Sequence, residues 1–463
     1  MNHRGLLQSF HGRLAGEALS NLAGIVGALI PERQLDRLRA SGTRRRVFTP
    51  IVTFWSFLAQ VLSPTQPCRE TVRQVQAERH RRGRSRICSG TAAYCQARRR
   101  LPESILQGIW EAIAGDLSEV SSPKMPWQGL RVGVVDGTTM SMPDTAPNQA
   151  AWPQSRRQSP GCGFPIMKMV GLFSLATGAI HKVATGSLHD SEQALFCQLW
   201  STLINGFDLL LGDRGFGSFA MFGALHCCGL HGVFRLHQRR KINWHKGKRL
   251  GKYDRLVTWN KPDDRLMWWL PMPVPQSLQI RILKVVVPIA GFRTRVLFIS
   301  TDLLDPKRFP PETLAELYRR RWQVELFFRH IKTTMHMDVL RCKSPVMIRR
   351  EFHTHLIAYN VIRALMLQSA LTYGTPLCRI SFKGTCDTLR QWAPHLAIVS
   401  ATPKLYHHLL RSMLQTIAND LVPLRPNRAE PRAIKRRPKP YPLLNKPRHL
   451  MCSPTGVQNE ITI

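Results

Sequence analysis

The chain has 463 residues, and its 66 Lys and Arg residues against 29 Asp and Glu residues give a formal net charge of +37. A hydrophobic content of 43% excludes a wholly disordered chain, and the length is sufficient for several domains with buried cores. Because no stretch reaches eighteen uninterrupted apolar residues, a membrane-spanning protein is not expected, and Arg4 and His11 argue against a secretory signal.

The charge excess is the first indication of function. So large an excess repels itself unless a polyanion neutralises it, and nucleic acid is the polyanion that this composition favours. A genome biased toward Arg codons is the alternative explanation, but it does not account for the scarcity of acidic residues. The 11 cysteines include no CxxC pair, so neither a disulfide framework nor a zinc ribbon is indicated, and reduced thiols are expected.

Residues 1–125 form the first predicted domain, which is helical and rich in Arg. Apolar residues recur at three-and-four spacing over residues 19–30, 47–62 and 104–117. Between these helices lie basic runs, and the first hundred residues hold 18 Arg, no Lys and 5 acidic residues. Because guanidinium groups bind phosphate oxygens well, we expect this domain to bind DNA.

Residues 126–238 are predicted to form the first part of an α/β core. Three strand-like runs come first, followed by a helix, a strand, a second helix and a last strand. These runs cover residues 131–136, 168–176, 179–184, 190–204, 208–212, 219–228 and 232–236. Alternation of strands and helices is typical of an α/β sheet.

Residues 239–300 predict a β-rich insertion, and residues 301–375 complete the core. One long helix is expected over residues 311–337, beginning at a Pro-Pro pair, and another over residues 348–371. The strand-like runs of the insertion are residues 253–259, 265–270, 278–287 and 294–299.

The chain ends in two further predicted regions. Residues 376–424 form a C-terminal helical region, with a helix expected at residues 387–392. Residues 425–463 form a basic, proline-rich tail, in which 9 basic residues, 1 acidic residue and 6 prolines lie between positions 425 and 448. Such a composition predicts an extended segment that orders only against an acidic partner.

Two aspartates share one local context. Asp136 ends a strand-like run and is followed by Gly-Thr, whereas Asp213 ends another and is followed by Arg-Gly-Phe. Catalytic and ligand-binding groups of open α/β sheets lie at the carboxyl ends of strands, so both carboxylates are candidates for one cleft. A single Asp before Gly is commonly only a turn residue. Two such positions in a chain so poor in acids favour a functional role.

The long helix supplies a possible third carboxylate. At about 100° per residue, Tyr318, Arg321, Glu325, Arg329 and Lys332 fall within a sector of about 80°. The other acids of this helix lie toward the opposite side. An ordinary salt bridge between Arg321 and Glu325, four residues apart, is the alternative explanation. It leaves the tyrosine and the lysine on the same stripe unexplained, so Glu325 is singled out as an acid among phosphate-binding groups.

Together these residues resemble the catalytic regions of DDE transposases from bacterial insertion sequences. The helical motif Tyr-x2-Arg-x3-Glu-x6-Lys is similar to the YREK signature that marks one large subgroup. The resemblance covers roughly residues 130–370. It implies an α/β fold with an RNase H-like mixed-sheet core that holds Asp136, Asp213 and Glu325 together and carries a β-strand insertion before the catalytic helix.

The resemblance also implies the chemistry. Asp136, Asp213 and Glu325 would be both the catalytic residues and the ligands of a pair of divalent ions, Mg²⁺ with Mn²⁺ as a substitute. Water would cleave the phosphodiester at the element's ends, and the freed 3′-hydroxyl groups would then attack target DNA in a cut-and-paste reaction. An RNase H-like endonuclease without strand transfer, and a non-catalytic DNA-binding protein derived from a transposase, are the alternatives.

Further expectations follow from the same resemblance. The partner would be double-stranded DNA, both terminal inverted repeats and target, bound by a homodimer at the nucleoid in the bacterial cytoplasm. Glu192 is interpreted as part of a helix start capped by Ser191 or Asp190, with a supporting role near the metals left open. The residues expected to contact DNA are Tyr318, Arg321, Lys332, Arg329 and Trp322. A tryptophan of the insertion could stack on a flipped base, the candidates being Trp244, Trp259, Trp268 and Trp269.

Overall fold

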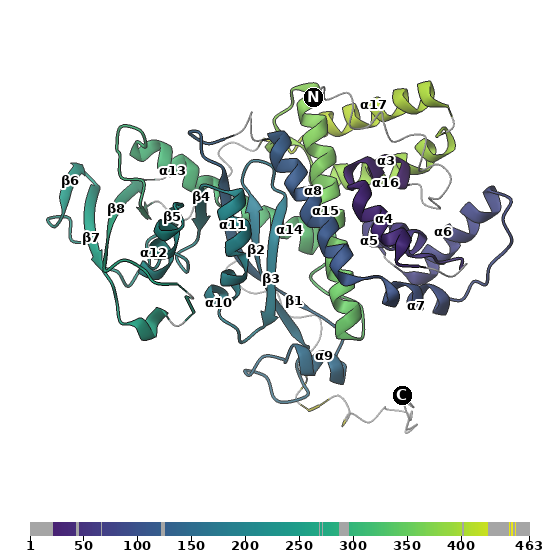
Figure 1. The fold of residues 1–463 in the computed structure, drawn as a ribbon, viewed down its shortest axis with the longest axis horizontal. Coiled ribbons are helices and arrows are strands. Elements are labelled where there is room, and N and C mark those ends of the chain that lie inside the picture. The colour runs from purple at the N-terminus through teal and green to yellow at the C-terminus, as the bar shows by residue number, and fades with distance from the viewer. Residues whose placement is uncertain are drawn as a thin grey trace.

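A mixed sheet of nine strands forms the centre of the computed structural model (Figure 1). The strand order is β3-β2-β1-β4-β5-β9-β8-β7-β6. The structure describes residues 22–450 except 43–45, 66, 122–125, 268, 271, 287–295, 401, 425–443, 445 and 448–449. Most of the predicted basic tail, and the candidate Trp268, therefore lie outside the described residues.

The first five strands have the arrangement predicted for an RNase H-like core. Strands β1 (Val132–Ser141), β2 (Ile166–Ser174) and β3 (Ile180–Ser187) form an antiparallel meander. Strands β4 (Leu209–Gly212) and β5 (His231–Arg235) run parallel to β1 on its other side. The predicted α/β class and the mixed sheet are thus confirmed.

The strands of the predicted insertion continue this sheet. They are β6 (Lys248–Gly251), β7 (Asp254–Asn260), β8 (Ser277–Val286) and β9 (Val296–Thr301). Because β9 pairs antiparallel with β5, the open edge of the core is covered by the insertion. Figure 1 shows β6, β7 and β8 at the left end of the molecule, opposite α6 and α7 at the right end.

The prediction of a strand at residues 265–270 of the insertion is wrong. Over residues 265–270 the structure has a short 3-10 helix, η3 (Asp264–Met267), instead of a strand. Asp263 Oδ1 accepts a hydrogen bond from the backbone N of Arg265 at 2.9 Å. Such a local bond competes with strand pairing and initiates a turn.

Helices cover both faces of the core sheet. Along β1, Val134 faces one hydrophobic core and Val135 the other, as expected from strand alternation. The Val135 side is covered by α10 (Glu192–Phe196), η2 (Cys197–Leu199), α11 (Trp200–Gly206) and α12 (Phe219–Cys227). The Val134 side is covered by α13 (Pro311–Arg320), α14 (Gln323–Arg329), η4 (His330–Thr334), α8 (Glu103–Ser121) and α15 (Pro345–Tyr373).

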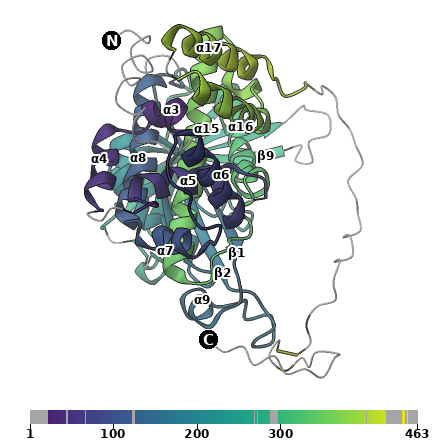
Figure 2. The same cartoon turned by 90° about the vertical axis from the view of Figure 1, so that its right-hand side faces the viewer.

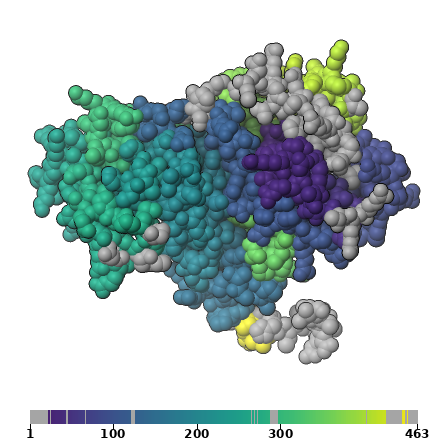
Figure 3. Space-filling view, viewed as in Figure 1, coloured from purple at the N-terminus to yellow at the C-terminus, as the bar shows by residue number. Residues whose placement is uncertain are grey.

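Helix α15 joins the core to the helical regions at both ends of the chain. Proline at its first position favours its start, and Gly374, with φ of +68°, ends it in the left-handed conformation. Around it pack α3 (Ala23–Val26), η1 (Gly27–Leu29), α4 (Glu32–Ala40), α5 (Pro50–Leu62), α6 (Cys68–Arg81), α7 (Ala92–Arg100), η5 (Leu377–Arg379), α16 (Phe382–Ile398) and α17 (Pro403–Asn419) (Figures 2 and 3). A short helix, α9 (Ala146–Ala151), follows β1. No helix among the described residues is long and apolar enough to cross a membrane.

The long helix predicted over residues 311–337 is interrupted. Helix α13 ends at Arg320, and the amides of Arg321 and Trp322 bond to carbonyls three residues back, at 3.1 and 3.2 Å. Helix α14 then runs to Arg329 and passes into the π-helical turn η4. Three-residue bonds tighten a helix and five-residue bonds widen it, so both departures rotate the side chains away from a single stripe.

Candidate active site

Asp136 lies in the middle of a strand, whereas the sequence had placed it at a strand end. Strand β1 continues through Ser141 because its far half still pairs with β2. Its parallel partner β4 is shorter, and Val134 lies opposite Leu211. Continuing this register by two residues places Asp136 level with Asp213, on the face that α13 and α14 cover. The two carboxylates are therefore brought together by strand register.

Backbone hydrogen bonds hold both aspartates. Asp136 Oδ1 accepts from the N of Gly137 at 2.8 Å, and Asp213 Oδ1 accepts from the N of Gly215 at 2.7 Å. The turn after Asp213 is held from outside by Gln193, whose Nε2 donates to the Gly215 carbonyl at 3.1 Å. Sequence reasoning missed Gln193, because this contact joins segments 22 positions apart and no local pattern indicates it.

Arg321 connects Asp136 to the third acid. Its guanidinium lies 3.5 Å from Asp136 Oδ2 through Nη1 and 3.2 Å from Glu325 Oε1 through Nη2. The arginine side chain is buried, with 7% exposed, while that of Glu325 is 50% exposed. The i,i+4 salt bridge weighed as an alternative is therefore present, but the same guanidinium also reaches across to β1.

The electrostatics of Asp136 are unusual for a carboxylate. Burial raises its pKa to about 6, and the nearby carboxylates of Asp213 and Glu192 add to this, against the opposing effects of the Gly137 amide and Arg321. Burial also raises the pKa of Glu192, which Asp213 adds to and Lys168 opposes. Three acids thus repel one another here, and added positive charge would stabilise their ionised forms.

Glu192 lies near Asp136 and Asp213, whereas the sequence indicated only that it belongs to the start of a helix. The predicted cap is confirmed, since Ser191 Oγ accepts from the N of Ala194 at 3.0 Å. The Glu192 carboxylate also occupies the space beside Gly137, where a Cβ would lie 2.6 Å from Oε1. Glycine at position 137 therefore leaves room for a fourth carboxylate near Asp136 and Asp213.

The remaining helical motif residues contact the strands that carry the aspartates. Lys332, in the π-helical turn, donates to Thr138 Oγ1 at 3.1 Å, and burial lowers its pKa. Tyr318 is 2% exposed and donates its hydroxyl to the carbonyl of Gly212, next to Asp213, at 3.3 Å. This buried position suits support of β4 better than the DNA contact expected from the sequence.

The other candidate DNA contacts are placed differently. Arg329 is exposed at the end of α14, whereas Trp322 is partly buried, with the Arg321 guanidinium 4.8 Å from its ring centroid. In the insertion, Trp259 is buried under Arg240, whose guanidinium lies 3.7 Å from the ring, and Trp244 is partly buried. Trp269 is also partly buried. The described tryptophans of the insertion thus pack against its hydrophobic core.

The donor set has the chemistry of a divalent-cation site. Asp136, Asp213, Glu192 and Glu325 offer hard oxygen atoms. Because burial raises the pKa of Asp136, a cation beside it would stabilise its ionised form. Among the described residues, however, no three His, Cys, Asp or Glu side chains stand together as metal ligands would. In this conformation Arg321, between Asp136 and Glu325, provides the positive charge.

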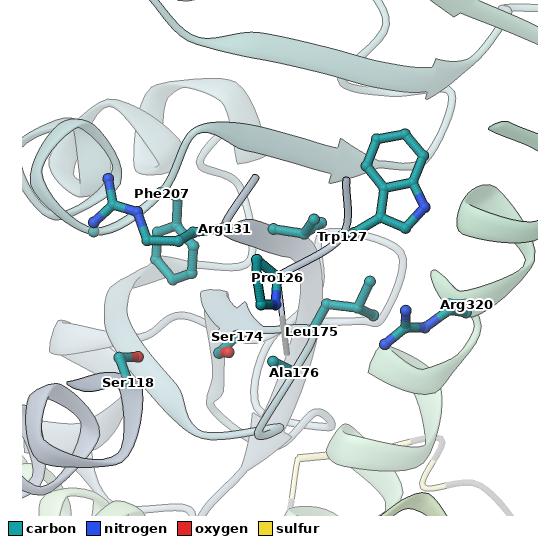
Figure 4. Close-up of a pocket in the computed structure, with 11 residues that line it drawn as sticks. Ser118, Pro126, Trp127, Arg131, Ser174, Leu175, Ala176, Phe207 and Arg320 are labelled. Atoms are coloured by element: carbon teal, nitrogen blue, oxygen red, sulfur yellow. The ribbon is translucent and has the colours of Figure 1, made fainter. Parts of the chain in front are cut away.

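The surface beside Asp213 is hollowed and basic. A hollow of about 540 Å³ adjoins the turn that follows this acid, and its lining residues are Gln193, Arg214, Gly215, Gly217, Ser218, His237, Arg239 and Arg240. A second cavity, between Arg131 and Arg320, lies at the opposite ends of β1 and β4 and holds only about 30 Å³ (Figure 4). That space suits about one water molecule, so the hollow beside the acids is the better candidate for a substrate surface.

Comparisons with known proteins agree with this arrangement. The family described as Transposase DDE domain matches residues 127–361. Transposase InsG of insertion sequence element IS4, from Escherichia coli strain K12, is 27% identical over 438 residues, which cover 93% of this chain and 96% of the relative. The transposase of insertion sequence element IS421, from Escherichia coli, is 36% identical over 59 residues, 13% of this chain and 16% of the relative.

A solved structure is similar only distantly. The cryo-EM structure of the piggyBac transposase synaptic complex with hairpin DNA aligns over 88% of this chain and 87% of that chain, with a TM-score of 0.43 and 10% identity. A likeness this distant carries no residue roles. The family match, by contrast, covers half of the chain and contains all three predicted acids. The chain therefore belongs to the DDE transposase family, and it is a DNA transposase of the insertion-sequence type.

Proposed function

We propose that this transposase cleaves the ends of its insertion sequence with Asp136, Asp213 and Glu325, and then joins the freed 3′-hydroxyl groups to target DNA by cut-and-paste. The observation that carries the proposal is the meeting of three distant segments, β1, the turn after β4 and α14. Arg321 pairs with Asp136 and Glu325, and burial together with Asp213 raises the pKa of Asp136.

Dependence on divalent metal is general for the DDE family. We assign to Asp136, Asp213 and Glu325 a pair of Mg²⁺ ions, with Mn²⁺ as a substitute. When bound, these ions would stabilise the charge on the attacking oxygen and on the leaving oxygen of the phosphodiester. Until then Arg321 offsets the charge of Asp136 and Glu325, and the Gly137 and Gly215 amides fix the orientation of the two aspartates.

The basic residues around the acids would hold the DNA backbone. Lys332, which contacts β1, offers a point charge, and the exposed Arg329 at the end of α14 offers a fork of donors. Arg321 would contact a phosphate beside the acids. Trp322 supports the Arg321 guanidinium from beside it. Tyr318 is proposed as a positioning residue, because its buried hydroxyl holds the Gly212 carbonyl next to Asp213.

DNA is the partner that family membership provides, and we propose how the chain divides the work. The Arg-rich helices of residues 1–125 would recognise the terminal inverted repeats, residues 126–238 and 301–375 would form the catalytic core, and residues 239–300 its insertion. Residues 376–424 would help a homodimer to form on two DNA ends, and the basic tail, residues 425–463, would add nonspecific contacts.

The proposal is tested by single substitutions in the full-length protein. Asp136→Asn, Asp213→Asn and Glu325→Gln are each expected to reduce Mg²⁺-dependent end cleavage at least a thousandfold, while binding of labelled end DNA changes less than threefold. Glu316→Gln is the matched control, because Glu316 is exposed on α13 and belongs to the same helical segment. Near-normal cleavage in all three variants would remove these acids from the site.

The products of the same reaction distinguish the alternatives. Transfer of labelled 3′ ends into a target plasmid is the result expected of a transposase. Cleavage without any joined product would favour an endonuclease without strand transfer. An element end that is bound but never cut, with every divalent ion tried, would favour a non-catalytic DNA-binding protein.

A further inference from the structure

Arg98, in the last turn of α7, is a buried cation without a carboxylate partner. The residue is 8% exposed, and its guanidinium lies 4.9 Å from the ring centroid of Phe57 and 5.0 Å from that of Tyr94. Within the part of the chain that the structure describes, no Asp or Glu forms an ion pair with it, and its Nε has no hydrogen-bond partner. Because an unpaired buried charge is costly, this guanidinium needs a counter-charge.

Two sulfur atoms surround the Arg98 guanidinium. Its Nη2 donates to Sγ of Cys68 at 3.3 Å and to Sγ of Cys95 at 3.6 Å, while Nη1 donates to Oε1 of Gln60 at 3.3 Å. The two sulfur atoms lie 4.0 Å apart, although Cys68 begins α6 and Cys95 lies on α7. A thiolate is therefore the counter-charge that this cluster can supply.

The titration of the two thiols agrees with that role. A hydrogen bond with Cys68 and the charge of Arg98 lower the pKa of Cys95 to about 5, whereas the same hydrogen bond raises the pKa of Cys68. The pair therefore loses one proton easily and the second with difficulty. Neither cysteine is fully buried, since both residues are partly exposed. The other titratable groups near the cluster are Tyr94 and Cys342, with Glu351 behind Cys342.

We propose that Cys95 and Cys68 form a reactive thiolate–thiol pair that hydroperoxides oxidise to a disulfide, which links α6 to α7. The Cys95 thiolate attacks one oxygen of hydrogen peroxide, the O–O bond breaks, and the departing hydroxide takes up a proton to leave as water. The thiol of Cys68 then displaces the hydroxyl of the resulting sulfenic acid, again as water. Two electrons thus pass from the two sulfur atoms to one peroxide.

The modification site lies apart from the acids of the proposed active site. Helices α6 and α7 belong to the Arg-rich helical region, and α7 carries Arg99 and Arg100 beside Arg98. Disulfide formation removes the thiolate and leaves Arg98 without its counter-charge, so the effect of oxidation falls on these helices. The inference does not depend on the roles proposed for Asp136, Asp213 or Glu325.

Alkylation of the full-length protein with iodoacetamide tests the thiolate. Rates are measured at pH 6 and pH 9, peptide by peptide, by mass spectrometry. Cys88 is the reference, because it is exposed in the same helical region and outside the cluster. The ratio of the rate at pH 6 to the rate at pH 9 cancels accessibility, and we expect it to be at least tenfold larger for Cys95. Equal ratios for the two cysteines would overturn the proposal.

Treatment with hydrogen peroxide and non-reducing peptide mapping test the disulfide. A peptide that links Cys68 to Cys95 is expected from the unmodified protein and from Arg98→Lys, which keeps the charge. Its yield should fall at least fivefold in Arg98→Met. Absence of the linked peptide from the unmodified protein, or an unchanged yield in a folded Arg98→Met, would contradict the proposal. If circular dichroism shows that Arg98→Met does not fold, the proposal is judged by the alkylation ratio measured on the unmodified protein.

Discussion

Asp136 is the residue at which the charges of the proposed site meet. It lies beside Asp213 by strand register, beside Glu192 by the absence of a side chain at Gly137, and against Arg321 through an ion pair. A largely buried carboxylate among other acids resists ionisation, so the ionised form of Asp136 is electrostatically unfavourable here. Binding of a metal ion would relieve the repulsion among these acids.

Asp136→Asn is therefore expected to stabilise the protein in the absence of metal. The pKa of Asp136 is raised to about 6 in the folded state against about 3.9 unfolded, so folding is favoured by its protonated form. Below about pH 4 the variant should unfold like the unmodified protein. As the pH rises from about 4 to about 6, the unfolded chain releases this proton before the folded protein does, so the unmodified protein alone loses stability, by up to about 3 kcal/mol, and loses no more above pH 6.

Thermal unfolding in EDTA between pH 4 and pH 8 measures this difference. The melting temperature of Asp136→Asn should exceed that of the unmodified protein at pH 8, and the gap should close near pH 4. Glu316→Gln, which removes an exposed acid, should show no such pH-dependent gap. A variant that is less stable at pH 8 would contradict the electrostatic account of Asp136.

The three acids could be identified from the sequence, but the residues that surround them could not be predicted from it. Asp136 and Asp213 each follow an apolar run, with a glycine one residue after Asp136 and two residues after Asp213, and Glu325 shares a predicted helical stripe with cations. Those are local patterns. The Gln193 contact to Gly215 and the burial of Tyr318 depend on how distant segments pack, which periodicity does not report.

At the scale of elements, the catalytic helix differs most from its prediction. Apolar periodicity indicated one helix, because the i and i+3 or i+4 spacing is the same on either side of a tightened turn. The break at Arg321 and the π-helical turn at Lys332 change the direction of the motif side chains. Arg321 and Lys332 consequently point to β1, and Tyr318 is buried against β4.

Lys332→Ala tests the function of this turn. Loss of a charged donor beside the acids should reduce end cleavage roughly tenfold to a hundredfold, since a hydrogen bond to a charged group contributes about 1.5–3 kcal/mol. Stability should change little, because burial already lowers the pKa of Lys332 and offsets the gain from its bond to Thr138. Single-turnover cleavage of labelled end DNA gives the rate.

The exposed Lys307, on the loop before α13, supplies the control. Lys307→Ala removes one positive charge without altering the motif, and it should cleave at the unmodified rate. Equal rates for Lys332→Ala and Lys307→Ala would place Lys332 outside the active site.

At the scale of the whole molecule, the sheet and α15 organise the regions that the sequence divides. The resemblance to DDE transposases implied the mixed core, and the order of strands and helices fitted it, but neither indicated that β9 would pair with β5 and make the insertion part of one sheet. Which strands pair depends on contacts between segments far apart in the sequence, and composition does not determine these contacts. Residues 1–125 and 376–424 were predicted to be helical, but the individual helices α4, α6, α7 and α17 were not delimited within them.

The structure shows where some of the basic residues lie. The Arg-rich helices of the first part of the chain pack beside α15 (Figures 1 and 2). The basic hollow adjoins the turn that follows Asp213. We propose that Asp136, Asp213 and Glu325 act together as metal ligands on the DNA end.

Metal-specific rescue of end cleavage tests this claim most directly. Asp136→Cys, Asp213→Cys and Glu325→Cys replace hard oxygen ligands by sulfur, which Mn²⁺ tolerates better than Mg²⁺. The account predicts that each variant is inactive in Mg²⁺, regains at least tenfold activity in Mn²⁺, and still binds end DNA, while Glu316→Cys cleaves equally in both. Normal cleavage in Mg²⁺ by the three cysteine variants would contradict it.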